Sequence, residues 1–162
     1  MGVALHTQRA RGEQADYPVV ELGEALVMFN SIPWEKEIEA WSEMPDGEIE
    51  NHRPLFQLMD DSEHSLRITA YSRDLMGLAY DYPVRICGTL AGPEFEQGYL
   101  ATNQFPRASL RELLACFFSV DEERMLALLC RYPPLATHTD DEPEQGVAPI
   151  AADALSGGVD VE

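Results

Sequence analysis

Residues 65–72 alternate strictly between two kinds of side chain, and this pattern constrains the fold more than any other feature of the sequence. The two sets that would face opposite sides are Leu66, Ile68, Ala70 and Arg67, Thr69, Tyr71. A period of two residues predicts a β-strand. A short apolar stretch, residues 55–59, comes just before it, and the turn-like residues 60–63 separate the two. The pair therefore predicts a β-hairpin.

Residues 75–82 and 84–87 are further strand candidates, although Gly77 and Pro83 weaken the first of them. Residues 88–105 contain three glycines and a proline, which predicts a loop-rich segment with one short strand near Tyr99. The middle of the chain is thus expected to supply about four antiparallel strands.

Helical spacing appears on both sides of these strands. Apolar residues in 22–29 fit a helix, but a buried strand fits the same run. Trp34, Ile38 and Trp41 share one helical face, and the turn at residues 45–47 ends that helix. Near the C-terminus, residues 109–112 and 119–122 each match a capping box before an apolar helical run, which predicts a helical hairpin.

These elements predict an α+β fold. It combines an antiparallel sheet of about four strands, an N-terminal helical region and a C-terminal helical hairpin. Residues 1–16 are polar and are expected to form a flexible arm. Residues 17–136 form the domain. Residues 137–162 contain seven acids, no Lys or Arg, and many Ala, Gly and Pro, which predicts a disordered acidic tail.

The charge balance restricts the classes of partner. The 162 residues include 29 acids and 11 bases, a formal net charge of −18. This charge repels nucleic acids and anionic membrane surfaces and attracts basic proteins. No apolar stretch is long enough to span a membrane. Three cysteines without a CxxC spacing favour reduced thiols, and we expect a cytoplasmic location.

No catalytic or nucleotide-binding motif is present in the sequence. His52 and His64 flank the first strand of the predicted hairpin, and carboxylates lie near His64, but a solvated turn explains this group better than a metal site. Cys87, at the end of a strand candidate, is the least implausible nucleophile. We therefore predict no catalytic residue, metal or cofactor.

Acidic residues concentrate between positions 35 and 50, and the two tryptophans of the chain lie just before this segment and within it. Tryptophan is frequent at binding hot spots, and carboxylates attract a basic partner. Alternatively, this segment is an amphipathic helix with its tryptophans in the core and its acids in water. The predicted partner-binding residues are Trp34, Glu35, Glu37, Glu39, Trp41, Glu43, Asp46, Glu48 and Glu50.

The sequence thus favours a non-catalytic domain that binds a basic protein. In size and composition alone it resembles an immunity or antitoxin protein, a resemblance that implies an inhibitor covering the basic cleft of a toxin. Two other hypotheses remain: an adaptor that works through its acidic tail, and an enzyme of unrecognised type with a carboxylate or metal site.

Overall fold

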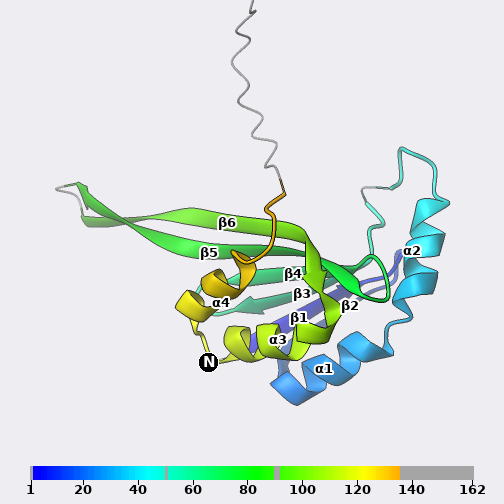
Figure 1. The fold of residues 1–162 in the computed structure, drawn as a ribbon, viewed down its shortest axis with the longest axis horizontal. Coiled ribbons are helices and arrows are strands. Elements are labelled where there is room, and N and C mark those ends of the chain that lie inside the picture. The colour runs from blue at the N-terminus through cyan, green and yellow to red at the C-terminus, as the bar shows by residue number, and fades with distance from the viewer. Residues whose placement is uncertain (1, 50, 90–91, 136–162) are drawn as a thin grey trace, which may run out of the picture.

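A computed structural model describes residues 2–49, 51–89 and 92–135, with side chains outside residues 85–95. The fold is α+β, as the sequence predicted, and consists of one antiparallel sheet and four α-helices in these ranges (Figure 1). None of these helices is long and apolar enough to cross a bilayer.

Six strands form the sheet in the order β2-β1-β3-β4-β5-β6. Their bounds are β1 Val3–Gln8, β2 Gln14–Val20, β3 Leu55–Asp60, β4 Ser65–Ala70, β5 Leu75–Thr89 and β6 Gly92–Pro106. The predicted hairpin is confirmed as β3 and β4, with Phe56 opposite Ile68. Beyond Tyr82, β5 pairs only with β6 among the described strands, and this two-stranded ribbon extends past the rest of the sheet (Figure 1).

The helices are α1 Leu22–Ser31, α2 Trp34–Ser42, α3 Leu110–Phe118 and α4 Glu122–Leu129. Helices α1, α3 and α4 cover one face of the sheet, whereas α2 stands beside the ends of the strands (Figure 1). The core lies between the sheet and these three helices. Representative core residues are Phe29, Leu58, Ile68, Tyr80, Leu113, Phe117 and Met125.

Local interactions fix where the helices begin. At α1, the Glu24 carboxylate accepts a hydrogen bond from the Glu21 backbone N–H at 2.9 Å, which satisfies a donor before the first turn. At α4, Asp121 is the cap, because its carboxylate accepts from the Arg124 N–H at 3.1 Å. The second capping box predicted Ser119 as the cap, two residues before the observed cap. Ser109, predicted to cap α3, makes no such side-chain bond.

Several expectations need correction. The flexible arm expected at residues 1–16 is wrong for the described residues 2–16: they contain β1, an interior strand between β2 and β3, and the start of β2. The helical region follows these two strands, and residues 22–29 are helical. Of the segment expected to be loop-rich, residues 92–105 belong to β6, whose long pairing with β5 tolerates its glycines, and residues 90–91 lie outside the described residues. The predicted tail, residues 137–162, lies outside the described residues.

The second face of the sheet carries no helix in Figure 1. Its side chains come from alternate strand positions, such as Gln57 on β3 and Arg67 on β4, which lie opposite each other in the ladder. We call this side the open face. It combines polar and small side chains, in contrast to the apolar face under the helices.

Candidate functional site

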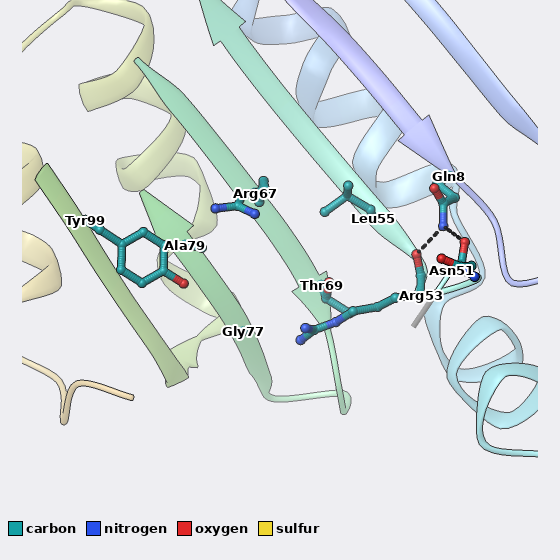
Figure 2. A pocket seen from close by; sticks show the side chains of 9 residues that line it. All are labelled: Gln8, Asn51, Arg53, Leu55, Arg67, Thr69, Gly77, Ala79 and Tyr99. Carbon is teal, nitrogen blue, oxygen red and sulfur yellow. Dashed lines mark hydrogen bonds between the residues drawn. The ribbon is translucent and has the colours of Figure 1, made fainter. Parts of the chain in front are cut away.

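A hollow of about 400 Å³ lies on the open face, where α2 and the segment that follows it meet the sheet (Figure 2). Thr69, Gly77 and Ala79 are the small residues of its sheet floor. We call this hollow the arginine pocket. The described residues that line it are Gln8, Asn51, Arg53, Leu55, Arg67, Thr69, Gly77, Ala79 and Tyr99.

The Arg53 side chain lies against two aromatic rings, and its backbone is held by a hydrogen bond. Its guanidinium carbon lies 5.7 Å from the ring centre of Trp41, at the end of α2, and 5.3 Å from that of Tyr71, just after β4. Both distances allow a cation–π interaction. The Gln8 amide donates to the backbone carbonyls of Asn51 and Arg53 at 2.8 and 3.1 Å, as the dashed lines in Figure 2 show. The segment that carries Arg53 is therefore fixed to β1.

Tyr71 lies directly over Gly77 of β5. A Cβ atom at Gly77 would overlap Cε2 of the Tyr71 ring and would lie 3.1 Å from its Cζ. Glycine at this position allows the ring to rest on the sheet, where it supports Arg53. Trp41, Arg53, Tyr71 and Gly77 thus form a layered arrangement at one end of the pocket.

Arg67 projects from β4 into the same hollow (Figure 2). Its Nη2 donates to the Asp81 carboxylate at 2.9 Å. Its Nε is buried and has no hydrogen-bond partner in the part of the chain that the structure describes. A buried N–H without a partner costs about 1–3 kcal/mol, so this atom favours an acceptor in the pocket.

The electrostatic surroundings of Arg53 differ from those of the molecule as a whole. Burial by its neighbours lowers the pKa of Arg53, Tyr99 opposes this effect, and the positive charge of Arg67 adds to it. Arg53 is an exposed residue overall, so the surrounding side chains displace only part of the water around its guanidinium. Arginine stays protonated near neutral pH. The pocket therefore holds a partly desolvated positive charge.

The acidic residues predicted as a binding site separate into two groups. Glu35, Glu39, Glu43, Asp46 and Glu48 are exposed, on α2 and in the segment after it. We call these five residues the acidic surface. Within residues 2–49, 51–89 and 92–135, no ion pair involves any of them. Glu50 lies outside the described residues.

The other predicted residues of this segment hold α2 in place. Trp34 is only 2% exposed, and its indole N–H donates to the Phe29 carbonyl at 3.1 Å. Trp41 is partly buried and donates to the Ile49 carbonyl. Glu37 pairs with Arg9 at 2.8 Å and accepts from the Ala10 N–H. The structure thus brings the carboxylates to the surface and turns both indole rings inward.

His52 and His64 do not form one site. They lie at opposite ends of β3, and a strand of that length separates them by roughly 20 Å. His64 is nearly buried between two carboxylates, with its Nδ1 3.0 Å from Asp60 and its Nε2 3.0 Å from Glu122. No group of three metal-ligating side chains was found in the part of the chain that the structure describes.

The cysteines occupy different surroundings. Cys116 is buried in α3, and burial raises the pKa of its thiol. Cys130, after α4, is exposed. The Cys87 side chain lies outside the described positions, so the prediction of a nucleophile there stays a prediction.

Sequence reasoning missed the arginine pocket. Alternation placed Arg67, Thr69 and Tyr71 on one face of a strand, but it gave no reason to connect them with Arg53 or with Tyr99. The available signal was the scarcity of bases, since only 11 accompany 29 acids. Comparisons of the chain with protein-family models, curated proteins and solved structures found no match.

Proposed function

We propose that this chain is a non-catalytic binding domain that recognises a basic partner protein through the acidic surface. The observation that supports this most is the exposure of all five carboxylates without an ion pair among the described residues. Carboxylates without partners keep their full charge available to a cationic surface. Lys36 is the one base in α2.

The contacts that hold α2 in place favour recognition, because α2 presents a rigid surface to the partner. Trp34, Glu37 and Trp41 connect the inner side of the helix to α1, to the turn after β1 and to the segment before β3. A surface that is already ordered loses less conformational entropy on binding than a flexible one. The outer side of α2 is thus presented in a fixed geometry.

The charge of the whole chain supports the same proposal. A formal net charge of −18 accelerates encounters with a basic protein at low salt. An immunity-type inhibitor is the narrower form of this proposal. In that form the carboxylates would take the place of phosphates in the cleft of a toxin that cleaves nucleic acid.

The test compares two sets of five neutral substitutions. One variant carries Glu35→Gln, Glu39→Gln, Glu43→Gln, Asp46→Asn and Glu48→Gln. The control carries Glu13→Gln, Glu63→Gln, Asp74→Asn, Glu96→Gln and Glu123→Gln. The control residues are also exposed, and their side chains make no hydrogen bond or ion pair in the described part of the chain. Both variants change the net charge equally.

Affinity capture from the source cells, followed by titration of the purified partner, measures the effect. We expect to capture a basic partner whose affinity falls as salt rises. The control should keep this affinity, and the first variant should lower it by about tenfold or more. Equal loss in both variants would show that only the overall charge matters and would contradict the proposal. Loss on deletion of residues 137–162 alone would favour the adaptor hypothesis.

A further inference from the structure

The arginine pocket has the opposite charge character to the rest of the molecule. Among the residues that the structure describes, the nine that line it include two arginines and no aspartate or glutamate, in a chain with 29 acids. From this arrangement we infer that the pocket binds a small organic oxyanion, a phosphate monoester or a carboxylate. This inference goes beyond the proposed function and does not depend on the acidic surface.

Two guanidinium groups supply the donors. Arg67 donates from Nη2 to Asp81, and its buried Nε has no partner within residues 2–49, 51–89 and 92–135. Arg53 has no carboxylate within ion-pair distance among the described residues. A guanidinium presents its N–H groups in a fixed fork that matches two oxygens of a carboxylate or phosphate. Asp81 offsets one of the two positive charges, and the pocket keeps the other.

The hollow has room for more than a bare anion. Its volume of about 400 Å³ falls in the range of small-molecule sites. The floor consists of Thr69, Gly77 and Ala79, which leave space above the sheet. Leu55 and Tyr99 add apolar and aromatic surface to the lining. A ligand with an organic body attached to its oxyanion fits this combination.

The donors are held in place before any ligand arrives. Arg53 lies against the Trp41 and Tyr71 rings, and Gln8 fixes its backbone. Thr69 donates to the Pro54 carbonyl at 2.9 Å, which secures the same segment to β4. Preorganised donors bind more tightly, because little side-chain freedom is lost. Burial also lowers the pKa of Arg53, and a bound anion would compensate for the lost hydration.

The surrounding charge selects for a small ligand. The negative field of the chain disfavours a polyanion such as nucleic acid, whose many phosphates would meet the acidic exterior. A single oxyanion interacts with the two arginines at short range, where salt and solvent screen the attraction less. The pocket is therefore suited to one anionic group.

The experiment titrates the full chain with phenyl phosphate, benzoate, inorganic phosphate and the neutral benzyl alcohol, and records the arginine Nε–H signals by NMR. We expect saturable shifts of the Arg53 and Arg67 signals with an anion and none with benzyl alcohol. Tighter binding of phenyl phosphate than of benzoate assigns a phosphate monoester, and the reverse order assigns a carboxylate.

Three variants and a control locate the binding. Arg53→Gln and Arg67→Gln should each weaken it by about tenfold. Arg73→Gln removes an exposed arginine outside the pocket and should leave it unchanged. Ala79→Leu keeps both charges but fills the floor, so it should abolish binding even if the arginine variants unfold.

Two results would overturn the inference. One is the absence of saturable binding of either anion up to about 20 mM, a concentration well above the dissociation constant of a weak site. The other is binding that survives both Arg53→Gln and Ala79→Leu. Neither result bears on the partner capture, because the five residues of the acidic surface remain unchanged in these variants.

Discussion

At the scale of single residues, Gly77 determines how the arginine pocket is built. Gly77→Ala would push the Tyr71 ring away from the sheet, and with it the support of Arg53. We expect a loss of about 1–3 kcal/mol in the free energy of unfolding, as for other overpacked sites. Denaturant unfolding monitored by circular dichroism measures the change.

Gly23 in α1 provides the matched control, since a Cβ there meets nothing within 4 Å. Gly23→Ala should stabilise the chain by about 0.4–1 kcal/mol, because alanine restricts the unfolded state. If both substitutions proved equally mild, the close contact between Tyr71 and Gly77 would not constrain the fold.

Tyr80 predicts a dependence of stability on alkaline pH. The residue is 2% exposed, and burial, with the charges of Glu122 and Asp60, raises the pKa of its phenol above the ordinary value of 10. A raised pKa in the folded state means that the unfolded chain releases this proton first. The resulting stability is fully present below about pH 10 and declines as the pH rises above it, by up to about 1.4 kcal/mol per pH unit.

Tyr80→Phe lacks this proton. We expect its free energy of unfolding to fall less steeply than that of the wild type between about pH 10 and 12. Urea titrations at several pH values give the two slopes. Parallel slopes would mean that the phenol ionises equally well in the folded and unfolded chains.

At the scale of elements, one side of α2 packs against the rest of the protein and the other side is exposed to solvent. Glu37→Ala would leave the Arg9 guanidinium without its carboxylate and the buried Ala10 N–H without its acceptor. We expect a loss of about 1–3 kcal/mol in the free energy of unfolding.

Glu39→Ala makes the same change of residue two positions later, on the exposed side of α2. Its effect should stay within about 0.5 kcal/mol, as for most surface substitutions. Thermal or denaturant unfolding of the two variants side by side is the measurement. A larger loss for Glu39→Ala would reverse the assignment of the two sides.

The same helix shows how far sequence patterns reach. Helical spacing correctly placed Trp34 and Trp41 on one face, and the amphipathic alternative assigned them to the interior. It also counted Glu37 among the solvated acids, whereas Glu37 pairs with Arg9 from 28 positions earlier in the chain. Such a pairing depends on tertiary contacts that no local period contains.

At the scale of the whole molecule, the sequence predicted the α+β class and the β3–β4 hairpin, because those segments carry strong local periods. The sequence predicted about four strands instead of six, because β1 and β2 lack a clean alternation and their positions depend on distant strands. The arginine pocket was beyond reach for the same reason. Arg53, Arg67 and Tyr99 come from separate segments, and only the register of β3 to β6 brings them together.

The interior position of β1 also affects how the chain is made. During translation, β1 and β2 leave the ribosome before β3, so one edge of β1 stays unpaired until the last residue of β3, Asp60, can pair with Val3. At ordinary rates of synthesis this delay lasts roughly 3–10 s. A lone two-stranded hairpin is marginally stable in water. The growing chain therefore exposes Val3 and Leu5 throughout this interval, and we expect chaperones to bind this stretch before the sheet closes.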